Sequence, residues 1–256
     1  MKHRKRTDQM HPVIFATSIF ALIALWQVAA ILTADPSIMP SPLAVLQIFQ
    51  AEALSGELWV HLIATLTRVL IAFSLAMIAG CLIGIALGLS HKANLWFGPW
   101  IVVFQNIPAL VVIVLCYLWI GLNETAAILA VAVNKTAMVA VTLREGVQTL
   151  DRKIEDMAQN FKLSRRAWVR HILLPQLTPF IAASTRNGLA IIWKIVLVVE
   201  FLGRSNGVGF QIHLYFQLFE TGYVLAYAFS FITIMLFIEY AIVRSWERKA
   251  VRWRHA

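Results

Sequence analysis

The chain has 256 residues, of which 60% are hydrophobic and only 14% are charged, and its formal net charge is +9. Soluble domains are about half apolar and about a quarter charged, so this composition excludes an ordinary soluble enzyme or binding domain. The mean hydropathy of +0.74, in apolar blocks near the ~20 residues that cross a bilayer, indicates an all-α membrane protein.

The apolar blocks predict a polytopic bundle of six transmembrane helices in a single domain covering 1–256. The expected spans are 12–33, 58–89, 99–120, 124–143, 180–202 and 223–243. The basic segment MKHRKR precedes the first block, but no small-residue cleavage site follows it. We therefore expect this block to remain as a membrane helix rather than to act as a signal peptide.

Lys and Arg are distributed unevenly between the connecting segments. With the N-terminus inside, 17 of them lie on the cytoplasmic side and Arg204 alone lies on the other side. Because cytoplasmic loops are enriched in these residues, we expect a multi-pass protein of the bacterial inner membrane with both termini in the cytoplasm. The segments are then cytoplasmic tails 1–11 and 244–256, an external connector 34–57 and a cytoplasmic loop 144–179. This pattern sets topology and does not indicate nucleic-acid binding.

Two sequence features in the first half of the chain predict helix geometry. Gly80, Gly84 and Gly88 recur every four residues, which permits close helix approach within the chain or to a second copy; we favour packing within the chain. Asn106-Ile107-Pro108 is expected to kink or restart a helix, because proline removes a backbone donor.

The cytoplasmic loop is too long and too charged for a tight turn between spans. Ile154, Met157, Ala158 and Phe161 share one helix face. Ser164 is expected to cap a second short helix that Pro175 stops. Two interpretations remain open from periodicity: docking of a soluble partner, or an amphipathic hairpin on lipid headgroups.

The loop resembles the EAA loop of ABC-importer permeases, the inner-membrane components of binding-protein-dependent transport. That pattern is close to E-A-A, three residues, G-A-S, about ten residues, then L-P. Asp156-Met157-Ala158, Lys162-Leu163-Ser164 and Leu174-Pro175 stand at these places with the spacing kept. Lys162 departs from the usual glycine, so either the turn geometry differs or the helix continues by one residue.

Other segments are similar to the same family, in the same order. They are HLIATLTRVLIAF (61–73), IPALVVIVLCYLWIGL (107–122) and RNGLAIIWKIVLVVEFLGRSNGVGF (186–210). The similarity covers about residues 40–250 and is greatest to the nitrate, sulfonate and taurine subfamily. It implies a type I importer permease with a cytoplasmic coupling helix.

The resemblance implies half of a translocation pore. The expected partners are a second, identical or paired permease, a cytoplasmic ABC ATPase dimer and a periplasmic substrate-binding protein. The chain lacks a phosphate-binding G-x-x-x-x-G-K-[ST] motif, so we expect no enzyme activity and no bound cofactor, with ATP and Mg²⁺ on the ATPase. The residues expected to couple to the ATPase are Glu155, Asp156, Met157, Ala158, Phe161, Lys162, Leu163, Ser164, Arg165 and Pro175.

Charges within the spans predict a substrate pathway. Charge at bilayer depth is costly and usually faces a cavity or a partner. The candidates are Asn106, Lys135, Lys194 and Glu200, with Lys194 and then Lys135 biasing the path toward an anionic or electron-rich solute. The opposing interpretation is snorkelling or an internal Lys–Glu pair. Gly207 and Gly209 are expected to form a gate or to contact the binding protein, or else a simple loop.

The solute is expected to be small: sulfonate, nitrate or taurine-like, or a small aromatic. The competing function is a stand-alone secondary transporter or channel. Such proteins often show repeats and broken helices, and the chain shows no internal repeat.

Overall fold

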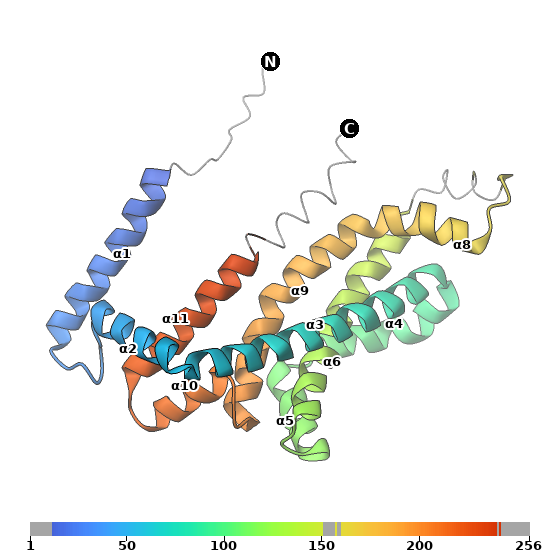
Figure 1. Cartoon of the computed structure of the whole chain (residues 1–256). Coiled ribbons are helices and arrows are strands. Elements are labelled where there is room, and N and C mark those ends of the chain that lie inside the picture. Colours follow the sequence, from blue (N-terminus) through green and yellow to red (C-terminus); the bar gives the residue numbers. More distant parts are fainter. Residues whose placement is uncertain (1–11, 151–156, 158–159, 240, 242–256) are drawn as a thin grey trace.

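The computed structural model describes residues 12–150, 157, 160–239 and 241. These residues form helices joined by short connectors (Figure 1), as predicted. The elements are α1 (Pro12–Thr33), α2 (Pro42–Ser55), α3 (Glu57–Leu89), α4 (His91–Asn106), α5 (Ala109–Ile120), α6 (Glu124–Gln148), α8 (Arg165–Trp168), a π-helical turn (Val169–Leu173), α9 (Leu174–Gly203), α10 (Val208–Gln217) and α11 (Thr221–Ile238).

Four helices in the described part, α1, α3, α6 and α11, are long and apolar enough to cross a membrane. A fifth crossing results if the bent pair α4 and α5 counts as one span. α9, which contains Arg186, Lys194 and Glu200, is not among them. The predicted count of six crossings is therefore not confirmed.

The third predicted span, 99–120, falls on two helices, α4 and α5, rather than on one. α4 ends at Asn106, α5 begins at Ala109, and the two are bent by 95°. Ile107 is extended because the residue before a proline is disfavoured from helical geometry, and Pro108 has no N–H to continue the helix. The predicted break at this tripeptide is confirmed. The Asn106 side chain donates to the Val102 carbonyl at 2.7 Å, which satisfies an acceptor near the helix end.

The glycine series lets α3 and α6 pack closely. A Cβ atom on Gly80 would lie 2.5 Å from Cβ of Val139, and one on Gly88 would lie 2.4 Å from Cβ of Val147. Side chains at these positions would force the helices apart. The predicted packing within the chain is confirmed.

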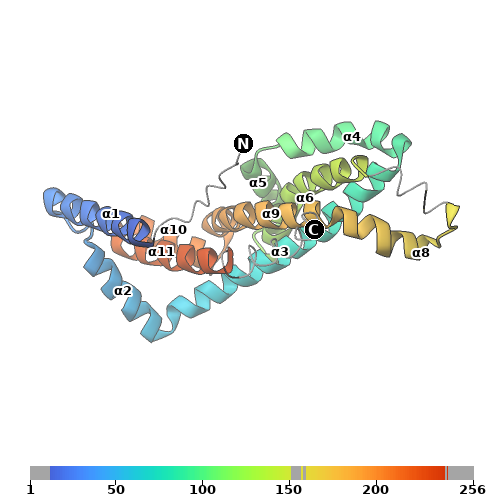
Figure 2. The same cartoon turned by 90° about the horizontal axis from the view of Figure 1, so that it is seen from above.

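The main core lies where α3, α5, α6, α9, α10 and α11 meet, and its largest enclosed side chains include Tyr227 and Phe231. α1 stands apart and packs chiefly on α2 (Figures 1 and 2). Its apolar side chains, such as Phe20 and Leu25, are largely exposed in the single chain. The bundle that positions the polar residues is thus formed without α1.

Pro175 does not end a helix, contrary to the prediction. α8 runs through the π-helical turn directly into α9, which contains Pro175 in its first turn. The Leu174 N–H bonds to the Val169 carbonyl, five residues back, in this wider turn. Since a proline ring would clash with the carbonyl four residues earlier, the π-helical turn offers a physical reason why the helix can continue.

Candidate functional site

An ionic cluster joins α3, α6 and α9. Arg68 of α3 is buried, and its Nη1 donates to Glu200 Oε1 at 2.6 Å. Its Nε and Nη2 donate to the two Glu124 oxygens at 2.6 and 3.0 Å. Nη1 also donates to the Asn206 carbonyl at 2.9 Å, and Nη2 to the Asn206 side-chain oxygen. One guanidinium thereby links two carboxylates and the connector between α9 and α10.

Glu200 is fully enclosed, at 0% exposure. Its Oε2 accepts hydrogen bonds from Thr65 Oγ1 and from the Gly209 N–H, each at 2.9 Å. The structure places Glu200 in a buried salt bridge with Arg68, where the charge of Arg68 and two further donors satisfy its carboxylate; its predicted role in the substrate pathway stays a prediction.

Gly207 and Gly209 pack against Glu200. Gly207 has φ 110°, and a Cβ there would lie 2.4 Å from the Glu200 carboxyl carbon. A Cβ on Gly209 would lie 2.2 Å from the Leu197 carbonyl oxygen. Both glycines therefore allow the connector to close over the carboxylate, while their roles at a gate or against a binding protein remain predictions.

A buried histidine continues the cluster. The Gly207 N–H donates to His61 Nδ1 at 3.0 Å, so the neutral ring carries its proton on Nε2. That nitrogen faces the Gln211 amide, whose Oε1 otherwise has no partner. We infer that the amide is turned so that Oε1 accepts from His61 Nε2. The start of α10 is thus held to α3 by polar contacts at both ring nitrogens.

The cluster contains residues that sequence reasoning missed as a site. Thr65 and Arg68 belong to the segment HLIATLTRVLIAF (61–73), which is similar to the family, and Arg204 bonds Glu124 Oε2 at 2.8 Å. An arginine in an apolar span was a signal that a carboxylate partner existed. The sequence did not identify which carboxylate, because Arg68 and Glu200 are 132 residues apart.

Among the predicted coupling residues that the structure describes, Ser164 and Arg165 stand at the start of α8, and Phe161, Lys162 and Leu163 directly precede them; α8 lies at the end of the molecule away from α10 (Figures 1 and 2). Glu155, Asp156 and Ala158 fall outside the described residues. Phe161 is 75% exposed, and Met157 and Leu163 are also exposed. Exposed apolar side chains clustered at a tip indicate a contact surface.

Lys162 adopts the left-handed conformation that the usual glycine would permit, with φ 50°. Lys162 therefore forms the same left-handed turn that a glycine would form. The alternative prediction, a helix that continues through Lys162, is wrong. Ser164 caps α8 as predicted, since its Oγ accepts from the Ala167 N–H at 3.3 Å. Arg165 begins α8 and is exposed.

The strain at Lys162 leads to a local prediction. Lys162→Val is expected to destabilise the turn by about 1–2 kcal/mol, because a β-branched residue tolerates a left-handed conformation poorly. Hydrogen–deuterium exchange should accelerate at the Phe161 and Ala167 amides, which bond to Met157 and Ser164. Lys162→Gly is the control and should exchange no faster than the wild type. Equal exchange in all three chains would contradict strain at this position.

The remaining pathway candidates differ in exposure. Asn106 is exposed at the end of α4, Lys194 is exposed on α9, and Lys135 is only 9% exposed on α6. Within the described part of the chain, none of these three forms a salt bridge with Glu200, whose salt-bridge partner is Arg68. Their roles in transport stay predictions.

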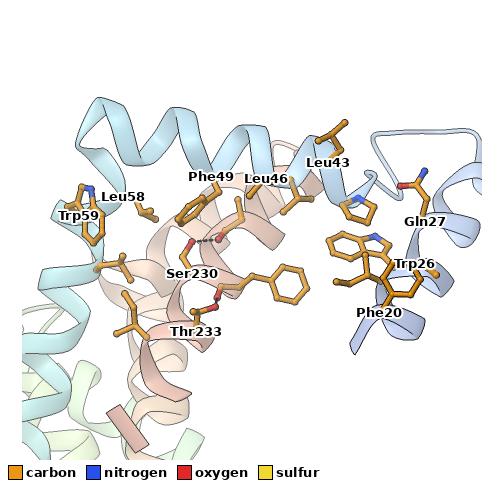
Figure 3. A pocket seen from close by; sticks show the side chains of 18 residues that line it. Phe20, Trp26, Gln27, Leu43, Leu46, Phe49, Leu58, Trp59, Ser230 and Thr233 are labelled. Carbon is orange, nitrogen blue, oxygen red and sulfur yellow. Dashed lines mark hydrogen bonds between the residues drawn. The ribbon is translucent and has the colours of Figure 1, made fainter. Parts of the chain in front are cut away.

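A groove of 960 Å³ lies between α1, α2, α3 and α11 (Figure 3). Apolar side chains such as Phe20, Phe49 and Leu58 line it. Ser230 and Thr233 donate to carbonyls of their own helix. The groove therefore offers few polar groups to orient a solute.

Comparison with known proteins places this arrangement in a family. The model of the family described as "Binding-protein-dependent transport system inner membrane component" matches residues 76–249. The chain is 30% identical to the putative aliphatic sulfonates transport permease protein SsuC of Bacillus subtilis (strain 168), over 99% of this chain and 91% of that protein. It is 29% identical to the taurine transport system permease protein TauC of Escherichia coli (strain K12), over 99% and 94%.

The fold is also similar to a solved one. A chain from the crystal structure of an amino acid ABC transporter with histidines matches with a TM-score of 0.64 and 20% identity, covering 78% of this chain and 97% of that chain. Membership removes the alternative of a stand-alone transporter or channel, because the energy source is a separate ATPase subunit. The chain belongs to the binding-protein-dependent transport system inner membrane components, and is the permease subunit of an ABC importer.

Proposed function

We propose that this chain forms half of a translocation pore with six crossings, counting α9 and the bent pair α4 and α5. Both termini lie in the cytoplasm of a bacterial cell. A second copy, or a paired permease, supplies the other half of the pore, and a periplasmic binding protein delivers the solute. ATP and Mg²⁺ bind to the ATPase dimer, and no cofactor binds to this chain.

The observation that carries the docking part of this proposal is the exposed apolar tip formed by Met157, Phe161 and Leu163. Exposed aromatic side chains on a rigid turn make effective anchors in a partner's pocket. Asp156 and Glu155 are placed by the sequence to meet basic groups of the ATPase, with Ala158 beside them, and Arg165 to meet acidic groups. This arrangement favours docking on a soluble subunit over a hairpin on lipid headgroups.

Replacing Phe161 tests the docking surface. Phe161→Ala is expected to weaken binding of the ATPase to the permease by about tenfold or more, as loss of a hot-spot aromatic does. The measurement is the ATPase affinity for the permease held in lipid nanodiscs. Phe219→Ala is the matched control, because Phe219 is 82% exposed but lies between α10 and α11. Equal affinity for both variants would defeat the proposed surface.

We propose a small organic anion of the sulfonate type as the solute. The names of the relatives, which refer to aliphatic sulfonates and taurine, support this class. The test is ATP-dependent uptake of ³⁵S-labelled ethanesulfonate by proteoliposomes that contain the permease, its ATPase and its binding protein. No uptake by the wild-type assembly would defeat this substrate class.

A further inference from the structure

Lys194 lies deep within the span that α9 is proposed to form. Gly203 is nine positions further along the helix, which is about 14 Å at 1.5 Å per residue. The charged residues Arg204 and Glu124 pair beside that helix end, as expected near a membrane boundary. Since the hydrocarbon core is about 30 Å thick, Lys194 lies near its midplane. The lysine stem, roughly 6 Å long, does not reach either surface from there.

The Lys194 ammonium lies over one aromatic ring rather than beside a carboxylate of the described residues. Its Nζ lies 5.4 Å from the centroid of the Trp193 ring, which attracts a cation. Trp193 in turn meets the buried ring of Phe231 edge-on, at 5.7 Å. Within the described residues, no carboxylate forms a salt bridge with Lys194. The ammonium is therefore positioned, and its charge remains available to an anion.

The other cations within the membrane-spanning helices are less available to an anion than Lys194 is. Arg68 is neutralised by Glu124 and Glu200, and Arg186 already has an interaction in the chain. Lys135 is enclosed, at 9% exposure, so a passing solute would not meet it without separation of the helices. The structure thus favours Lys194 over Lys135 as the cation that meets the solute. The sequence alone did not separate these two lysines sharply.

The exposed face of α9 carries polar side chains as far as Lys194 and apolar side chains from there to Gly203. Asn187 and Lys194 are exposed two turns apart, while Val198 and Leu202 continue the same face toward Gly203. A lipid-facing helix surface would not carry an unpaired ammonium at this depth. This face must therefore border a water-accessible path or another protein chain.

We propose that Lys194, oriented by Trp193, is the residue in the pore that contacts the anionic group of the transported solute, with the Asn187 amide as a second polar contact on the same face. The inference rests on the proposed function. The recognised chemistry is a singly charged oxyanion such as a sulfonate, which accepts hydrogen bonds from an ammonium and an amide. The contact determines which solutes cross after the binding protein has released them.

The first experiment measures uptake of ³⁵S-labelled ethanesulfonate by the complete transporter in proteoliposomes. Lys194→Met is expected to reduce uptake about tenfold or more, as loss of a charge-assisted hydrogen bond does. Stimulation of the ATPase by the loaded binding protein should persist, because the coupling tip is unchanged. Lys194→Arg, which keeps the charge, should retain most of the uptake. Val198→Met is the matched control, since it adds a methionine one turn away on the same face. Unchanged uptake by Lys194→Met, with an active wild type, would overturn the inference while leaving the proposed function intact.

The second experiment does not require transport or a stable Lys194→Met protein. Lys194→Cys is made in a chain with Cys81→Ala and Cys116→Ala, and the assembled transporter is treated with a negatively charged methanethiosulfonate reagent. We expect the reagent to label the new cysteine, and we expect ethanesulfonate to slow this labelling. A cysteine that reacts only with a membrane-soluble maleimide would show that this face meets lipid, and would overturn the inference. Wild-type transporter without ethanesulfonate uptake would instead count against the substrate class.

Discussion

Arg68→Met is expected to lower the free energy of unfolding of the chain by about 3–5 kcal/mol, because it leaves a buried carboxylate without its counter-charge. Arg68 is 3% exposed and Glu200 is 0% exposed, and their 2.6 Å contact is reinforced by bonds from Thr65 and Gly209. Thermal unfolding of the detergent-purified protein provides the measurement.

Two further variants determine whether the buried charge is the cause. Glu124→Gln changes the partner whose side chain is 46% exposed, and it should cost clearly less than Arg68→Met, because Arg68 keeps its salt bridge with Glu200 and no buried charge is left without a partner. The double variant with Arg68→Met and Glu200→Gln should recover part of the loss, since the uncompensated charge is gone. If Arg68→Met unfolds at the wild-type temperature, the ionic cluster does not stabilise the bundle.

Gly84→Ala should destabilise the chain by about 1–3 kcal/mol, the usual cost of overpacking, although alanine is the better helix former. Its Cβ would lie 2.5 Å from the Ala140 carbonyl oxygen and 2.8 Å from Leu143 Cβ. The first of these is backbone and cannot rotate away, so α3 and α6 must separate. Thermal unfolding again measures the effect.

Gly188→Ala is the matched control for this prediction, and the opposite sign is expected. The nearest atom to a Cβ at Gly188 is Phe73 Cε2, at 3.7 Å, which is an ordinary contact. Since nothing must move, the variant should gain part of the roughly 1 kcal/mol by which alanine exceeds glycine in a helix. A loss of stability at both positions, of equal size, would argue against close α3–α6 packing as the cause.

Local features of the fold could be predicted from the sequence. Pro108 predicted the break between α4 and α5, Ser164 predicted a cap, and the spacing of Gly80, Gly84 and Gly88 predicted a close helix contact. Each depends on the chemistry of a residue and its immediate neighbours. The angle of the break, 95°, depends on what the two helices pack against, so it could not be predicted from the local sequence.

The ionic cluster shows what the sequence could not supply. Glu200 was noted as a deep charge, yet its partner is on α3 and not on a neighbouring turn. Pro175 was expected to stop a helix, because its effect in an isolated α-helix is well defined; the π-helical turn before it changes the hydrogen-bond spacing that this expectation assumes. Long-range pairing and local changes of helix type both require the assembled bundle.

The helix that begins beside the exposed tip at Arg165 passes through the π-helical turn and continues without interruption to Gly203, a path of roughly 60 Å along its curved axis at 1.5 Å per residue (Figure 1). At its far end, the helix is fixed to α3 by the salt bridge between Glu200 and Arg68. Lys194 therefore lies on one unbroken run of helical backbone between the exposed tip and the buried salt bridge, so the same helix connects both to the position of its ammonium.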